Sequence, residues 1–172
     1  SVVTTDGLST SDPSTGTITV GVDGVADVPS LTVDSAVSGV EDGGPIALDI
    51  ASSLTDVDGS ESLSITISGV PVGATLSAGT LNEETGEWTL DPSELAGLTV
   101  TPAADSGDDF QLTVTATSME ADGGDTATQT ATIDVSVASQ ADAPDLTVDA
   151  ASGVEDGGAI PLTIDADAAT QD

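Results

Sequence analysis

The chain lacks every cationic side chain: it has no lysine, arginine or histidine beside 31 aspartate and glutamate residues. Its formal net charge at pH 7 is therefore −31. Such a chain cannot neutralise phosphate groups, which excludes nucleic acid as a partner and argues against contact with anionic membranes. High net charge is typical of disorder, but an apolar fraction of 37% with regular spacing favours a folded protein.

Cysteine and tyrosine are absent as well, and Trp88 and Phe110 are the only aromatic residues. No disulfide can form, and neither a Ser-His or Cys-His catalytic pair nor a zinc site with its usual ligands can be assembled. The triplet Asp105–Gly107 resembles the Asp-Ser-Gly of aspartic proteases, but it occurs as a single copy and we interpret it as a turn. A glycosidase-type carboxylate pair would lack the aromatic platforms that usually bind sugars. We therefore expect neither enzymatic activity nor a small-molecule substrate.

Long apolar runs are also missing. No stretch is long enough to span a bilayer, and no basic segment precedes an apolar core as in a secretion signal. We expect no direct membrane contact, and we expect any export signal to lie outside this sequence.

The feature that organises the chain is an internal repeat. The heptapeptide Ser-Gly-Val-Glu-Asp-Gly-Gly occupies residues 38–44 and returns unchanged at residues 152–158. The preceding segment, residues 27–34, is matched by residues 142–149. The period is close to the size of a whole domain, which predicts a tandem array. We expect residues 1–26 to end one repeat, residues 27–141 to form a complete repeat, and residues 142–172 to begin another, all within a longer array.

Inside the complete repeat, apolar residues alternate with threonine and serine, which is the pattern of half-buried β-strands. Glycine-rich and aspartate-rich turns separate the runs, and only the segment from Asp91 to Gly97 predicts a helical turn, with Asp91 as N-cap and Pro92 at the first position. About seven or eight short strands in a domain of this size predict an all-β fold, an antiparallel β-sandwich. The residues expected inside are Val33, Leu48, Ile65, Ile67, Phe110, Leu112, Val114, Ile133 and Val135, and those expected outside are Thr66, Thr113 and Asp134.

Most acidic residues lie in the loops between these runs. Glu41 and Asp42 form one cluster, residues 56–61 another, and Asp105 with residues 108–109 a third. Neighbouring carboxylates repel, and a chain without cationic side chains cannot relieve that repulsion internally. A hard divalent cation can, and calcium takes six to eight oxygen ligands from carboxylates, carbonyls and water. The acids predict bound calcium; the alternative is a solvated acidic surface of the kind that salt adaptation favours.

Three segments together resemble the extender repeats of giant bacterial RTX adhesins. They are Gly39–Gly43, Leu54–Glu61 and Leu95–Pro102. The resemblance implies cadherin-like or Ig-like domains in long arrays, type I secretion, an extracellular location at the bacterial cell surface, and calcium at the junctions between domains. The glycine-rich calcium nonapeptides of RTX proteins do not occur in this sequence.

The resemblance also implies roles for single residues. Glu41 corresponds to an acid after the first strand and Glu155 to its counterpart in the next repeat, while Asp27 and Asp142 correspond to linker acids. Asp56 and Asp58 correspond to an Asp-x-Asp pair of ligands. We expect Glu41, Asp56 and Asp58 to join Asp27 in one calcium cluster, and Asp142 and Glu155 to join Asp108 or Asp109 in a second.

The function that follows is mechanical. We expect a calcium-rigidified spacer of a secreted surface adhesin, which projects a ligand-binding head for cell adhesion or biofilm formation and contacts the neighbouring repeats of its own polypeptide. The alternative is a glycan-binding or homophilic adhesion module. Exposed aromatic residues would favour sugar binding, and Trp88 is the main candidate for such a contact.

Overall fold

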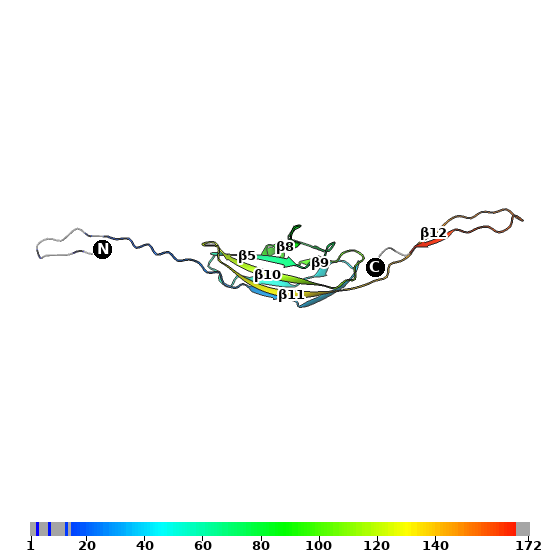
Figure 1. Ribbon diagram of the computed structural model, residues 1–172. Coiled ribbons are helices and arrows are strands. Elements are labelled where there is room, and N and C mark those ends of the chain that lie inside the picture. Colours follow the sequence, from blue (N-terminus) through cyan, green and yellow to red (C-terminus); the bar gives the residue numbers. More distant parts are fainter. Residues whose placement is uncertain (1–2, 4–6, 8–12, 14, 168–172) are drawn as a thin grey trace.

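The computed structural model describes residues 3, 7, 13 and 15–167, and these residues form β-strands and loops almost exclusively (Figure 1). This part of the chain contains no α-helix and no helix long and apolar enough to cross a membrane. The expectation of an all-β fold is therefore confirmed. The strands are β1 Ser30–Val33, β2 Ala36–Val40, β3 Ile46–Ala47, β4 Ile50–Ser53, β5 Glu61–Ser68, β6 Thr75–Leu76, β7 Thr80–Asn82, β8 Glu87–Leu90, β9 Thr99–Thr101, β10 Phe110–Glu120, β11 Thr126–Ala138, β12 Asp145–Val148 and β13 Ile164–Asp167.

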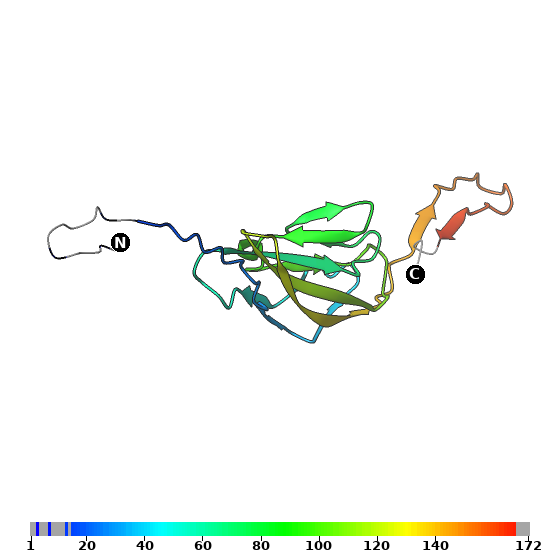
Figure 2. The same cartoon turned by 60° about the vertical axis from the view of Figure 1, so that its left-hand side comes forward.

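The largest sheet has six strands in the order β2-β11-β10-β5-β8-β7. Its centre is the hairpin of β10 and β11, whose long strands run the length of the compact region in Figures 1 and 2. A three-stranded sheet, β3-β9-β6, and the pair β1-β4 complete the domain between residues 27 and 141. The chain reaches this region at one end and leaves it at the opposite end, toward β12.

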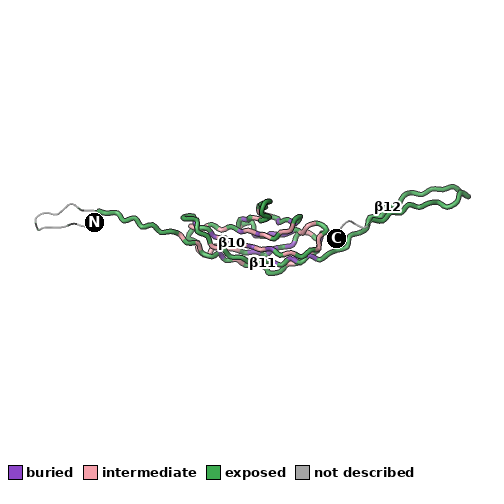
Figure 3. The backbone as a smooth tube through the Cα atoms, in the orientation of Figure 1, coloured by how far each residue is buried: buried purple, intermediate pink, exposed green. Residues whose placement is uncertain are grey.

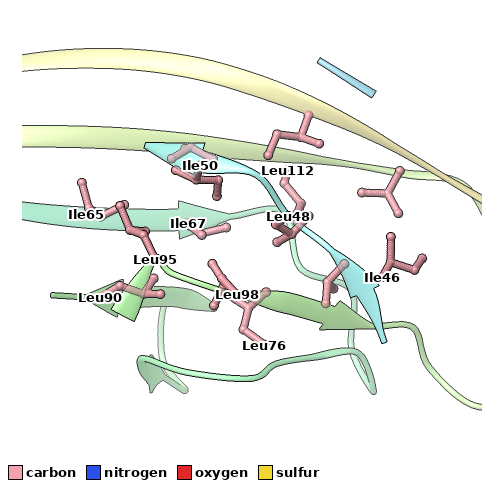
Figure 4. Packing of buried hydrophobic residues seen from close by; sticks show 14 of the residues in the cluster. Ile46, Leu48, Ile50, Ile65, Ile67, Leu76, Leu90, Leu95, Leu98 and Leu112 are labelled. Atoms are coloured by element: carbon pink, nitrogen blue, oxygen red, sulfur yellow. The ribbon is translucent and has the colours of Figure 1, made fainter. Parts of the chain in front are cut away.

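The apolar core lies between the six-stranded sheet and the smaller sheets. Figure 4 shows Ile46, Leu48 and Ile50 from β3, β4 and their connection facing Ile67 and Leu112. Valine, leucine and isoleucine build this core, since Trp88 and Phe110 are only partly buried at its margin. Burial in Figure 3 is concentrated in this central region.

The register of the long strands agrees with the sequence pattern. Leu112 and Val114 are fully buried (0% exposed), whereas Thr113 between them is on the other face. Asp134 is exposed, as expected, and Thr66 and Thr113 are half-buried on the same outer face of the sheet. Thr115 and Thr130 meet across β10 and β11 on this outer face, with 3.3 Å between their hydroxyl oxygens.

Three expectations about the fold are wrong. The domain is not purely antiparallel, because β2 pairs in parallel with β11; the chain changes sheets between β1 and β2 and then runs along the free edge of β11. It contains eleven strands, β1 to β11, because short stretches at β2, β6 and β7 pair with neighbours despite their weak alternation. Val33 and Phe110 are half-buried, since Val33 lies in the two-stranded pair β1-β4 and Phe110 at the very start of β10.

The predicted helical turn is present as a 3-10 helix, η1, at Pro92–Glu94. Asp91 caps it by accepting hydrogen bonds from the backbone N–H and the hydroxyl of Ser93. Glu94 completes the capping box, because its carboxylate accepts a hydrogen bond from the Asp91 N–H at 2.7 Å.

The second copy of the repeated segment shares part of the local conformation of the first. β12 pairs with β13 in the register of β1 with β4, so that the pair Val148 and Ile164 corresponds to Val33 and Ile50. The turn inside the motif is also shared, since Asp42 and Asp156 both adopt positive φ angles, of 54° and 63°. The second copy lacks counterparts of β2 and β3, whose partners in the first copy are β11 and β9.

Gly39, inside the repeated motif, allows a close approach that offers a test of the core. A Cβ atom there would lie 2.6 Å from Ile46 Cδ1, and Ile46 is buried. We predict that Gly39→Ala lowers the free energy of unfolding by about 1–3 kcal/mol, because the packed core cannot yield to the added methyl group. Denaturant unfolding followed by circular dichroism measures the change.

The matched control is Gly153→Ala in the second copy. Its Cβ would meet Ile160 at a similar distance, but Ile160 is 49% exposed and can move aside. The control should change the free energy of unfolding by less than about 0.5 kcal/mol. Equal losses for the two variants would show that the local turn, and not the core, requires the glycine.

Candidate metal centre

Three carboxylates from separate segments meet at the end of the domain where the chain leaves β11. Asp42 follows β2, Asp105 lies between β9 and β10, and Asp142 follows β11. Each offers a carboxylate oxygen within 4.8 Å of the others, and all three residues are exposed. We call Asp42, Asp105 and Asp142 the exit triad. It is the one such group of at least three acidic residues within the described residues.

The backbone of two triad residues is held in an unusual conformation. Asp42 has φ of 54° and Asp105 has φ of 53°, in the left-handed region that side chains other than glycine rarely occupy. Aspartate and asparagine tolerate this region best, because their short polar side chains can bond locally. Both loops therefore turn sharply at the residue that faces Asp142.

Buried polar contacts position the loops of the exit triad. Glu41 is only 2% exposed, and its carboxylate accepts a hydrogen bond from the backbone N–H of Gln140. The Glu41 N–H in turn donates to the carbonyl of Ala138. On the other side, the Asp109 carboxylate accepts a hydrogen bond from the Val137 N–H at 2.8 Å. Glu41 and Asp109 thus fasten the two acidic loops to the end of β11.

The loop that carries Asp105 also packs closely against the chain after β11. Gly107 lies against Ser139, so closely that no side chain would fit at position 107. A small cavity here is lined by Glu41, Asp105, Ser106, Gly107, Asp108 and Ser139. The cavity brings Glu41 and Asp108 next to Asp105 of the exit triad.

The electrostatics of the exit triad are unbalanced within the chain. Two unit charges 4 Å apart repel by about 1 kcal/mol in water and by about 4 kcal/mol at an effective dielectric constant of 20. No lysine, arginine or histidine exists anywhere in the sequence to offset this repulsion. The three carboxylates could hold a metal ion, which would supply the missing positive charge.

The first calcium cluster that the sequence predicted does not form as expected. Glu41 lies beside Ala138 and Gln140, at the end of β11. Asp58 bonds Ser60, which contacts Glu120 near the start of β11. The 13 residues of β11 place about 40 Å between these ends, so that Glu41 cannot share an ion with Asp56 or Asp58.

Asp27, Asp56 and Asp58 do lie in one region, at the end where the chain enters the domain. The Asp27 N–H donates to the Glu61 carboxylate at 2.7 Å. Asp56 accepts a hydrogen bond from the Asp58 N–H at 3.0 Å. The carboxylates of Asp56 and Asp58 are therefore engaged with backbone N–H groups of their own loop, whereas Asp27 contacts the Glu61 side chain through its backbone N–H.

The second predicted cluster is met only in part. Asp142 belongs to the exit triad and Asp108 lines the adjoining cavity, whereas Asp109 is bonded to Val137. Glu155 is exposed in the connection between β12 and β13 and is not part of the triad. Asp42 and Asp105 were not predicted as partners of Asp142, although the sequence places both in acidic loops. Asp42 lies within the repeated heptapeptide, and Asp105 lies in a predicted turn beside Asp108 and Asp109.

The loop at Asp58 offers a test of how these carboxylates are held. The hydroxyl and then the backbone N–H of Ser60 donate to Asp58, and these bonds hold the pKa of Asp58 below its ordinary value. They favour the ionised form, so their contribution to stability is present at neutral pH and is lost as the pH falls through the folded-state pKa. We predict that Ser60→Ala raises the pKa of Asp58, measured by carboxyl-carbon NMR in the presence of EDTA.

Asp91 provides an internal control for that titration. Ser93 lowers the pKa of Asp91 in the same way, first through its hydroxyl and then through its backbone N–H. The pKa of Asp91 should therefore be unchanged in the Ser60→Ala protein. An unchanged Asp58 titration would contradict the hydrogen-bonded loop geometry.

Comparison with known proteins identifies no relative of this chain. No protein-family model, no curated protein and no solved structure matches the chain.

Proposed function

We propose that this protein is a calcium-binding structural spacer, built from tandem β-sandwich domains whose junctions are stiffened by the bound ion. The observation that carries the proposal is the exit triad. It combines two loops of the domain, at Asp42 and Asp105, with Asp142 in the segment that leads away from the domain. An ion held by all three would fix the direction in which the chain leaves.

Calcium is the cation that this group of ligands suits best. Every candidate ligand is a carboxylate or a backbone or hydroxyl oxygen, and hard oxygen ligands favour calcium or magnesium over zinc or copper. The exit triad is exposed and built from irregular loops, which suits the flexible geometry of calcium better than the strict octahedron of magnesium. Water and carbonyl groups of the same loops can complete the coordination.

A spacer role is supported by the positions of the two ends of the domain. The chain reaches the domain at one end of β11 and leaves at the other, so each domain adds its full length to an array (Figure 1). The tandem array itself is supported by the second copy of the motif, in which β12 and β13 reproduce the register of β1 and β4. The sandwich is supported by one apolar core between the six-stranded sheet and the smaller sheets.

The biological setting follows from the sequence resemblance. We propose an extender segment of a secreted RTX-type adhesin at the bacterial cell surface, without enzymatic activity, whose partners are the neighbouring domains of its own polypeptide. The net charge of −31 supports this setting, because an extracellular medium that contains calcium can neutralise the loops.

The first prediction for this function concerns the exit triad. Calcium should raise the melting temperature of the chain, because an ion that binds only the folded form stabilises it, by about 2.7 kcal/mol at a hundredfold excess over the dissociation constant. Asp105→Asn should reduce that rise, since asparagine tolerates the same φ but carries no charge. Scanning calorimetry in calcium and in EDTA measures the difference.

The matched control is Asp122→Asn, which removes an exposed acid in the turn between β10 and β11, away from the triad. It should leave the calcium-dependent rise unchanged. Equal reductions for the two variants would show a general effect of surface charge instead of a site.

The second prediction concerns stiffness. A chain of three joined copies of residues 27–141 should be nearly rod-like with calcium, and its maximum dimension in small-angle X-ray scattering should shrink in EDTA. Without the ion, the carboxylates at each junction repel and favour bent arrangements. Identical dimensions in both conditions would leave the acids as surface charge and refute the stiffened spacer.

A further inference from the structure

A cavity of about 250 Å³ lies at the margin of the core, beside the edge of the main sheet that β7 forms. We call it the Trp88 cavity, because Trp88 of β8 lines it and is the one tryptophan in the sequence. Leu81 of β7, which is paired with Trp88 across the two strands, lines it as well. The opposite wall is the segment between β5 and β6, with Val70, Pro71 and Ala74. None of these residues belongs to the exit triad or to the cavity beside it.

The apolar walls of the Trp88 cavity are only partly covered by the domain. Trp88 lies on the same face of β8 as the buried Leu90 and packs against the core, but it is itself half-buried. Leu81 is 42% exposed, and Val72 is fully exposed. Exposed apolar side chains therefore border a cavity with an aromatic wall, an arrangement that is typical of binding surfaces.

The polar side of the Trp88 cavity is acidic. Glu83, in the turn between β7 and β8, lines the cavity, and Glu84 and Glu87 follow it in the sequence. Asn82 holds this turn in place, because its side-chain oxygen accepts a hydrogen bond from the Glu84 N–H at 3.0 Å. The sequence contains no cationic side chain that could pair with these carboxylates. The cavity thus combines an indole ring and a carboxylate, and the chain offers no positive charge to either.

This combination of groups suits a guanidinium ion best. A cation over the face of a tryptophan ring is attracted by the π electrons. The planar guanidinium of arginine stacks on aromatic rings and also donates two parallel hydrogen bonds to a carboxylate. A sugar is a poorer fit, because its hydroxyls need several hydrogen-bond partners, and the side chains that line the cavity supply only the Glu83 carboxylate and the Trp88 indole N–H.

A free strand edge runs beside the Trp88 cavity. In the part of the chain that the structure describes, β7 ends the six-stranded sheet and pairs only with β8 (Figure 2). The backbone groups of β7 that point away from β8 can therefore pair with an added strand. A residue of that strand opposite Leu81 would lie about 10 Å from Trp88, two strand spacings away. A long arginine side chain and the large indole ring together bridge this distance.

We propose that β7 and the Trp88 cavity bind an arginine-bearing segment of another protein, which adds to the main sheet as a strand. Its backbone pairs with Thr80–Asn82, and its arginine enters the cavity between Trp88 and Glu83. A second copy of this chain is not the partner, because it contains no arginine and repels the first copy through its own charge of −31. Charge complementarity selects a basic partner. The site adds lateral docking to the proposed spacer function and does not depend on calcium.

The test uses the full chain and the synthetic peptide Thr-Val-Thr-Arg-Thr-Val-Thr. Because Trp88 is the only tryptophan, its fluorescence reports directly on the cavity. Binding should shift its emission and protect it from quenching by acrylamide. A peptide with norleucine in place of arginine should bind about tenfold more weakly, because it keeps the length but loses the cation. A peptide with N-methylated backbone amides should lose binding, since it cannot pair with β7.

Glu83→Gln is the decisive variant, because it removes a charge at the surface and leaves the apolar packing in place. It should weaken binding of the arginine peptide about fivefold in isothermal titration calorimetry. Asp122→Asn is the matched control, which removes the same charge from the exposed turn between β10 and β11 and should leave the affinity unchanged. Trp88→Leu should weaken binding about tenfold, and circular dichroism establishes that this variant folds.

Several results would overturn this docking site. Absence of binding at millimolar peptide refutes it outright. Equal affinity for the arginine and norleucine peptides indicates a purely apolar groove, and equal affinity for the N-methylated peptide excludes strand pairing. Free arginine amide that binds as tightly as the peptide indicates a site for small cations. Equal losses for Glu83→Gln and Asp122→Asn indicate general attraction of a basic peptide to an acidic surface.

Discussion

The complete absence of cationic side chains determines how this structure is held together. Its carboxylates can bond only to backbone N–H groups, to neutral side-chain donors such as hydroxyls and amides, or to metal ions. The backbone bonds are concentrated where the chain enters and leaves the domain. Glu61 and Asp125 accept from Asp27 and Ala26 on one side, and Glu41 accepts from Gln140 on the other. The acids that give the chain its charge therefore also fix its two connections.

This arrangement separates two tasks among the acidic residues. Some carboxylates, such as those of Asp109 and Glu41, are used by the fold, because each satisfies a backbone N–H near the end of β11. Others, such as those of the exit triad, face one another without a protein partner of opposite charge. The first group is satisfied within the fold, whereas the second is where the proposed calcium ion would supply the missing positive charge.

The sequence predicted those features that depend on local pattern. Strict alternation in residues 110–116 predicted β10 and its register, and the Asp91-Pro92 pair predicted the start of a helical turn. Strand β2 was not predicted, because Ala36–Val40 contains a glycine and a serine and becomes a strand only beside β11. The second copy of the motif supports this explanation, since residues 152–154, identical to residues 38–40, form no strand there without such a partner.

The candidate sites were harder to predict because they depend on distant segments. Residues Asp42, Asp105 and Asp142 are far apart in the sequence, and only the packing of two loops on the end of β11 brings them together. The inward-facing positions of Glu61 and Glu120 were hidden for a related reason. Glu61 begins β5 and Glu120 ends β10, each beside a turn, and the β5-β10 pairing turns both toward the core.

The parallel pairing of β2 with β11 has a mechanical consequence. If the ends of the domain are pulled apart, the force on the segment before β2 and the force on the segment after β11 act in opposite directions along neighbouring strands. The five residue pairs between β2 and β11 are then loaded in shear, so they resist together and are not peeled apart one after another. Tension along an array of such domains would thus be borne by the edge of the main sheet, where β2 pairs with β11.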